Sequence, residues 1–121
     1  MRGITVYAAA LVGFALCASA AHAEYGAFAL DSGTGKYGDS WNERDQRAAD
    51  QAALKGCGSS NCKVVFQVGP KHCGAIAMTE NGKIWGGADR DARDAAKLAA
   101  LENCQKRTKE QCVVRANECN R

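Results

Sequence analysis

Cysteine is the residue type whose number and spacing most clearly predict chemistry in this chain. Six of the seven cysteines follow residue 23: Cys57, Cys62, Cys73, Cys104, Cys112 and Cys119. An even number of cysteines in a small exported domain predicts a disulfide framework, and six cysteines allow 15 connectivities. Metal binding is the alternative, but the pairs separated by four and seven residues are poorly spaced for zinc. We therefore expect disulfides and no metal site.

One set of side chains could support hydrolysis. A serine, a histidine and an aspartate can form a catalytic triad, and Ser40, His72 and Asp39 are the candidates. However, the sequence has no nucleophile elbow of the form G-x-S-x-G. His72 directly follows residues 69–71 (GPK), a combination typical of an exposed linker. A small envelope hydrolase is therefore kept as the alternative function, and not as the favoured one.

No cofactor or nucleic-acid partner is indicated. The segment 33–36 (GTGK) resembles the end of a phosphate-binding loop, but Leu30 stands where the motif needs glycine and Tyr37 where it needs serine or threonine. Basic and acidic residues are interspersed, and the formal net charge is only +3. Proteins that bind nucleic acid usually carry a basic stripe or patch. We therefore expect neither kind of ligand.

Three aromatic side chains are the candidates for contact with a partner. Tyr37 and Trp41 lie around the expected second strand of the first half, and Trp85 lies around its counterpart in the second half. Exposed aromatic rings can stack on sugars or anchor a partner protein. Packing in the core is the alternative for each ring, because so small a domain needs large buried side chains.

The chain after residue 24 contains one unit written twice. The segment 26–30 (GAFAL) returns as 74–78 (GAIAM), and Cys57 returns as Cys104. Two copies are too few for a solenoid, which needs at least three. The repeat therefore predicts one compact domain with approximate internal twofold symmetry, and its two copies lie at about 25–69 and 73–119.

This repeat selects one of the disulfide connectivities. Cys57 and Cys62 hold the same places in the first copy as Cys104 and Cys112 in the second, so each pair is expected to bridge within its own copy. The remaining two cysteines have no counterparts and pair by elimination. The predicted bridges are Cys57–Cys62, Cys104–Cys112 and Cys73–Cys119.

The first expected strand of each copy has one bulky and one small face. Alternate residues of a strand point to opposite faces, so Phe28 and Leu30 share one face while Ala27 and Ala29 share the other. Residues 75–78 (AIAM) repeat this pattern. Neither face is polar, so we expect both to be covered, the small face by an alanine-rich helix.

Such a helix is expected after the second strand of each copy, at residues 43–55 and 90–102. The residues best suited to N-caps and to left-handed C-caps are, in chain order, Asn42, Gly56, Asp89 and Asn103. Close packing on the small strand faces is expected to bury Ala52 and Ala99.

The first 23 residues have the composition of a secretory signal. Arg2 supplies a positive charge, residues 6–18 form an apolar segment too short to span a bilayer, and residues 21–23 (AHA) form a cleavage site. We therefore expect a signal peptide at 1–23 and one exported domain at 24–121, without a transmembrane segment. Its expected location is the periplasm or the outside of the cell.

Several motifs, taken in order, resemble those of a known family of bacterial proteins. The matching segments are 25–29 (YGAFA), 40–42 (SWN), 52–57 (AALKGC), 62–65 (CKVV) and 73–77 (CGAIA). They are similar to family 4189 among the domains of unknown function. The resemblance implies a small exported protein with disulfides, and it supplies no catalytic residue. The segment 84–88 (IWGGA) departs from the pattern of this family.

Together these observations predict an α+β domain of two ββαβ units, each with one helix on a small antiparallel sheet and stapled by disulfides. The favoured function is a non-enzymatic interaction or effector-type module, which we expect to be monomeric. Its expected partner is an unknown protein or envelope component, contacted through Tyr37, Trp41 and Trp85.

Overall fold

The computed structural model describes residue 3 and residues 23–121, so nearly all of the predicted signal peptide lies outside the described residues. The described chain runs strand, strand, helix, strand, and then repeats this order. The elements are β1 (Tyr25–Leu30), β2 (Tyr37–Glu43), α1 (Gln46–Cys57), β3 (Lys63–Val68), β4 (Cys73–Met78), β5 (Trp85–Arg90), α2 (Arg93–Gln105) and β6 (Val113–Cys119). Neither helix of the described chain is long and apolar enough to cross a membrane.

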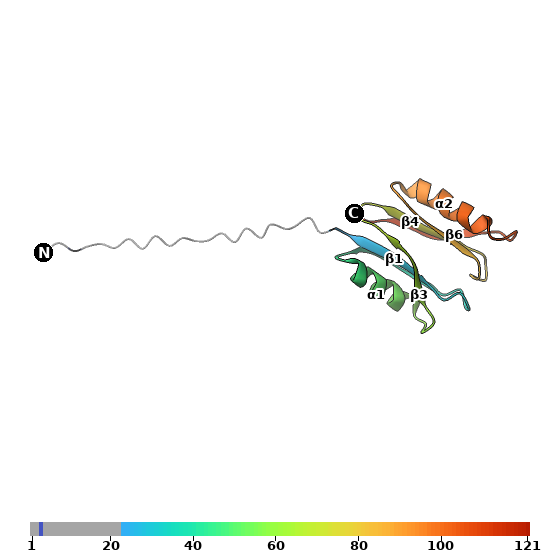
Figure 1. Cartoon of the computed structure of the whole chain (residues 1–121), viewed down its shortest axis with the longest axis horizontal. Coiled ribbons are helices and arrows are strands. Elements are labelled where there is room, and N and C mark those ends of the chain that lie inside the picture. Colours follow the sequence, from blue (N-terminus) through green and yellow to red (C-terminus); the bar gives the residue numbers. More distant parts are fainter. Residues whose placement is uncertain (1–2, 4–22) are drawn as a thin grey trace.

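Each ββαβ unit builds its own antiparallel sheet of three strands. The strand orders are β2-β1-β3 and β5-β4-β6, so the first strand of each unit is central. The helices α1 and α2 lie on opposite outer sides of the domain, with the strands between them (Figure 1). The predicted fold class, an α+β domain of two ββαβ units, is confirmed.

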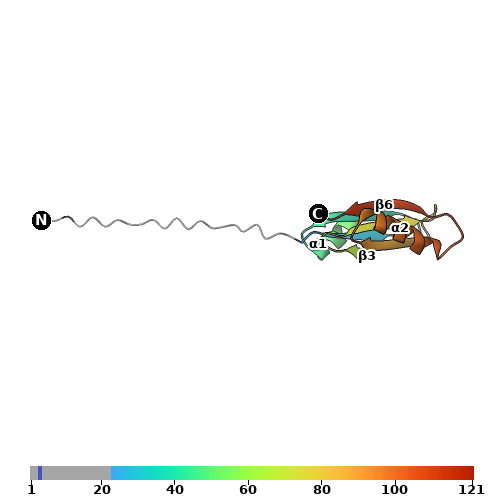
Figure 2. The ribbon, with the colours of Figure 1, turned by 90° about the horizontal axis from the view of Figure 1, so that it is seen from above.

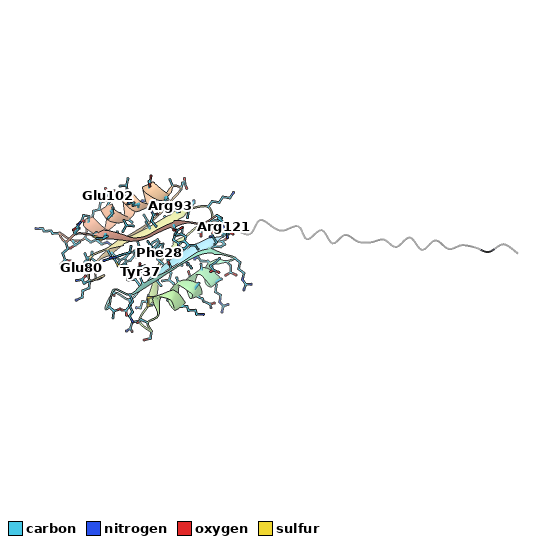
Figure 3. The ribbon with its side chains drawn as sticks, turned by 180° about the vertical axis from the view of Figure 1, so that it is seen from behind. Phe28, Tyr37, Glu80, Arg93, Glu102 and Arg121 are labelled. Carbon is cyan, nitrogen blue, oxygen red and sulfur yellow. A yellow bond between two sulfur atoms is a disulfide. The ribbon has the colours of Figure 1, made fainter. Side chains whose placement is uncertain are left out.

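The two faces of each central strand pack against different layers. On the small face of β1, Ala27 and Ala29 cluster with Ala53 of α1. On its bulky face, Phe28 packs with Ile76 of β4 in a core between the two sheets. All five side chains are fully buried, and Phe28 lies near the centre of the domain (Figure 3). The layers therefore follow the order helix, sheet, sheet, helix.

Two seams run along the sides of this sandwich, because each sheet has two edge strands. β3 approaches β5 at one seam, and β2 approaches β6 at the other. Figure 2 shows the domain as a flat body with β3 and β6 along opposite sides. At each seam, both sheets of the sandwich reach the surface together.

The helices begin three residues later than predicted. Asn42 and Asp89, the expected N-caps, lie within β2 and β5, because these strands stay paired with β1 and β4 to their last residues. The N-cap of α1 is Asp45, whose carboxylate accepts the Ala48 N–H at 2.7 Å. The N-cap of α2 is Ala92, which makes no side-chain cap. Both predicted N-caps were wrong.

The C-terminal ends of the helices also lie further along the chain. α1 ends on Gly58, whose left-handed backbone has a φ of 76°, so Gly56 lies inside the helix. The cap of α2 is Lys106, which has a right-handed backbone, and Asn103 lies inside that helix. The predicted C-caps were therefore wrong as well.

The buried face of each helix differs from the predicted face by one residue. Ala53 and Ala100 are fully buried, whereas Ala52 and Ala99 are only half-buried. Both helices bury every fourth residue and end that row on a cysteine: Ala49, Ala53 and Cys57, then Ala96, Ala100 and Cys104. Adjacent alanines fit an apolar helical stripe equally well, and only the facing sheet decides which of them is buried.

Three disulfides connect these elements in the pairing that the repeat predicts. Cys57–Cys62 and Cys104–Cys112 each join the end of a helix to the start of the next strand, with Cα–Cα distances of 6.2 Å. Cys73–Cys119 joins opposed residues of β4 and β6. Each helix is thus fastened covalently to the sheet that it covers, and the last strand is fastened to the start of the second unit.

Candidate functional site

The candidate hydrolytic residues are not brought together. Ser40 is buried on β2, and its hydroxyl donates a hydrogen bond of 2.6 Å to the Ala49 carbonyl of α1. The Asp39 carboxylate accepts the indole N–H of Trp41 at 3.0 Å. In the described chain, no hydrogen bond joins either residue to His72. The predicted Ser-His-Asp set does not form, because the serine proton is held by a helix carbonyl and no base accepts it.

His72 instead lies between two carboxylates at the connection of the two units. Its Nδ1 is 2.5 Å from Oδ1 of Asp89, and its Nε2 is 3.2 Å from Oδ1 of Asp91. The second Asp89 oxygen accepts the Gly69 N–H at 3.1 Å. His72 thereby fastens the β3–β4 connection to the end of β5. Within residues 23–121, no cluster of histidine, cysteine and acidic side chains could hold a metal ion.

The structure separates the three candidate aromatic residues. Trp41 is half-buried and packs edge-on against Phe28 at 5.3 Å between ring centroids, so it belongs to the core between the sheets. Tyr37 is 36% exposed at the β2–β6 seam, where its hydroxyl donates to the Arg115 carbonyl at 3.3 Å. Figure 3 shows Tyr37 on the side of the domain along which β6 runs. Trp85 opens β5 at the other seam and is half-buried.

An aromatic ladder leads from the core to the surface at the β3–β5 seam. The Phe66 ring of β3 stacks on Phe28 at 4.5 Å and on Trp85 at 6.1 Å, with interplanar angles of 16° and 9°. Phe66 also packs against Gly87 of β5, where any side chain would overlap the phenylalanine ring. We define the β3–β5 seam by Phe66, Trp85, Gly87, Asn103 and Arg107. Its outer ring, Trp85, is held in a fixed orientation by packing from within.

Two hollows adjoin each other along this seam. One has a volume of about 450 Å³ and is lined by Phe66, Trp85 and the end of α2. The other has a volume of about 490 Å³ and is lined by Val65, Lys63 and the β1–β2 turn. Trp85 lines both hollows. Volumes of 300–1,000 Å³ are typical of ligand sites.

The outer edge of β5 is closed by side chains. The Arg107 guanidinium donates to the Trp85 carbonyl at 3.2 Å and lies 5.4 Å from the centre of the indole ring. The Asn103 amide donates to the Gly87 carbonyl at 3.0 Å, and Arg90 donates to the Asp89 carbonyl at 2.7 Å. Three alternate carbonyls of the edge strand are therefore occupied. Such an edge does not readily accept an added strand.

The acidic group of the second hollow is satisfied internally. The Asp31 carboxylate accepts the Ser59 hydroxyl at 2.8 Å and the Gly33 N–H at 3.0 Å. The Ser59 hydroxyl, together with Thr34 and the neighbouring backbone N–H groups, lowers the pKa of Asp31. Asp31 is therefore a charged group that stabilises the β1–β2 turn.

The largest hollow, of about 750 Å³, lies elsewhere, between the β4–β5 turn and the loop before β6. It is lined by Glu80, Asn81, Glu110, Gln111, Val113 and Arg115. It has no aromatic side chain, and its charges are of both signs. Binding sites usually combine apolar or aromatic walls with a few convergent polar groups. The β3–β5 seam fits that description better.

Sequence reasoning missed two main parts of the seam. Phe66 lies in an apolar strand (63–68), where nothing in the sequence distinguishes a ring that reaches the surface. Arg107 belongs to the basic segment 106–109, which by itself is typical of a solvated loop. The departure of residues 84–88 (IWGGA) from the family pattern was the available signal, because it contains both Trp85 and Gly87.

The fold and the bridges define a class: a small disulfide-bonded α+β domain made of two ββαβ units. The chain belongs to the DUF4189 family, a domain of unknown function, whose family model matches residues 25–119. This agrees with the resemblance seen in the sequence motifs. No solved structure matches the chain.

Mycobacterial proteins are among its relatives. The chain is 43% identical over 56 residues to Protein Rv1269c of Mycobacterium tuberculosis, which covers 46% of this chain and 43% of that protein. It is 38% identical over 81 residues to the uncharacterized protein Rv1813c of the same species, which covers 67% and 53% respectively. The chain thus matches about half the length of these relatives.

Proposed function

We propose that this protein is a non-enzymatic interaction module that binds a protein or envelope component through the β3–β5 seam. The aromatic ladder from Phe28 through Phe66 to Trp85 carries this proposal. A ring that is supported from within and bordered by a hollow loses little side-chain entropy when a partner covers it. Aromatic anchors of this kind dominate the binding energy of many interfaces.

The alternative, a small envelope hydrolase, has no support in the arrangement of the candidate residues. Ser40 donates its proton to a helix carbonyl, and His72 is held by Asp89 and Asp91. A nucleophile and its base must lie within hydrogen-bonding reach of each other. These contacts favour structural roles for both side chains.

Replacing Trp85 with alanine is expected to weaken binding of the partner about thirtyfold, because loss of an interface anchor commonly costs about 2 kcal/mol. The measurement is retention of a partner from envelope and extracellular fractions by the immobilised, folded protein. Tyr37→Ala is the matched control, since Tyr37 opens β2 at the opposite seam as Trp85 opens β5. His72→Ala is expected to retain the partner.

Melting curves of each variant separate loss of recognition from loss of folding. Full retention by Trp85→Ala at unchanged stability would show that the seam is not the binding surface. A measurable turnover that only His72→Ala abolishes would replace the module with an enzyme.

We further propose that this module acts outside the cytoplasm after removal of residues 1–23. The three disulfides support this proposal, since such bridges persist in oxidising compartments. Protein recovered from the periplasm or the medium is expected to begin at Glu24, as N-terminal sequencing or intact mass would show. Recovery of the full-length chain only from the cytoplasm would contradict export.

A further inference from the structure

The seam is long enough to receive an extended chain. Its two hollows adjoin at Trp85, one beside α2 and the other beside the β1–β2 turn. A single small ligand would fill one of them, whereas an extended segment could occupy both and pass over the indole between them. The three capped carbonyls of β5 argue against strand addition, so such a segment would be recognised by side chains.

The charges that face the seam are unbalanced. Arg90, Lys106 and Arg107 border one hollow, and Lys63 borders the other. In the described chain, no carboxylate lies within ion-pairing distance of Arg90, Arg107 or Lys63, and Lys106 has only a distant exposed partner at 3.9 Å. These cations therefore remain available to an incoming ligand.

The two carboxylates of the same hollows are already in use. Asp89 is held by His72 and by the Gly69 N–H, and Asp31 is held by Ser59 and the Gly33 N–H. They are therefore poor partners for an incoming cation. The charge that the seam presents outward is positive around an aromatic floor.

The second unit of the fold provides an internal comparison. Phe66 pairs with Phe28 as Ala116 pairs with Ile76 in the other sheet, and Trp85 pairs with Met78 as Tyr37 pairs with Leu30. The β2–β6 seam thus has alanine and tyrosine where the β3–β5 seam has phenylalanine and tryptophan. The aromatic floor is confined to the seam that carries the cations.

We infer that the β3–β5 seam binds an extended acidic segment of a partner protein, with an apolar side chain of that segment against Trp85 and its carboxylates on Arg107, Lys106 and Arg90. This inference rests on the proposed function and names the chemistry of the partner. Arginine forms bidentate pairs with carboxylates, and complementary charge selects partners and raises association rates.

The test is a titration of the folded, disulfide-bonded protein, labelled with nitrogen-15, with short capped peptides. Each peptide has a central leucine flanked by glutamates, by glutamines or by lysines. The chain has two tryptophans, and therefore two indole N–H signals. The Trp41 indole, bonded to Asp39 in the core, is the internal reference for Trp85.

The glutamate peptide is expected to move the Trp85 signal saturably and to leave the Trp41 signal in place. The glutamine peptide is expected to bind at least tenfold more weakly, and the lysine peptide not at all. Arg107→Glu should weaken binding of the glutamate peptide at least tenfold. Arg115→Glu, an equal charge change on an exposed arginine of β6, should change it less than twofold.

The contrary outcomes are distinct for the two proposals. Equal binding of the glutamine or lysine peptide at Trp85 would overturn the acidic partner and leave the seam as a binding surface. A lack of response to all three peptides, with Trp85-dependent capture of a partner, would also overturn the acidic partner alone. Partner capture that does not depend on Trp85 would overturn both.

Discussion

Removing the Cys73–Cys119 bridge, by replacing both cysteines with alanine, is expected to lower the free energy of unfolding by about 4 kcal/mol. The two cysteines are 46 residues apart, so the bridge closes a long loop and greatly restricts the unfolded chain. It also joins opposed residues of β4 and β6 and thereby anchors the last strand. The measurement is the denaturant midpoint and slope of the variant, compared with those of the oxidised protein.

The short bridges are the matched controls for this prediction. Cys57–Cys62 and Cys104–Cys112 span only 5 and 8 residues, so their removal is expected to cost about 2 kcal/mol each. If removal of either short bridge destabilised the protein as much as removal of the long one, loop closure would not be the source of the stability.

Replacing Gly38 with alanine is expected to cost about 3 kcal/mol, at the upper end of the range for overpacking. Gly38 lies on β2 where α1 crosses it, and an added methyl group would overlap the Ala53 carbonyl oxygen and the Cys57 nitrogen. Both are main-chain atoms of a helix that a disulfide also holds, so they cannot move aside. For a domain of this size, the melting temperature should fall by roughly 12–24 °C.

Gly56 on the facing helix provides the control. It lies within α1, its backbone is not left-handed, and an added methyl group would meet its nearest neighbour at 3.7 Å, an ordinary contact. Gly56→Ala is therefore expected to stabilise the protein by about 0.5–1 kcal/mol. Destabilisation by Gly56→Ala would mean that the helix ends at Gly56. An unchanged melting temperature in Gly38→Ala would contradict the close approach of α1 to β2.

Much of the fold was predictable because local patterns report directly on local packing. The alternation of Phe28 and Leu30 with Ala27 and Ala29 predicted that both faces of β1 are covered, and that a helix of small residues covers the small face. The bulky face was different. A strand pattern shows that a face is buried but not which element buries it, so the packing of Phe28 against Ile76 of the other unit was not predicted.

The helix ends were mispredicted for a related reason. Asn42 and Asp89 have good capping chemistry, but pairing with β1 and β4 keeps them in strands, and this long-range effect overrides a local preference. Ala92 has no capping side chain at all, so cap chemistry could not have identified it. The choice of Ala53 over Ala52 likewise depended on the position of the facing sheet.

The sequence by itself determined the disulfide pairing and the order of the elements, because a repeat and the period of side chains along a strand are properties of the chain alone. The candidate site was decided by tertiary structure. Trp41 and Trp85 look equivalent in the sequence, yet one ring fills the core and the other forms the outer end of a ladder. Ser40 and His72 suggest catalysis only until their partners are known. These roles arise where two sheets and a helix end meet, among residues far apart in the chain, and no local pattern encodes such a meeting.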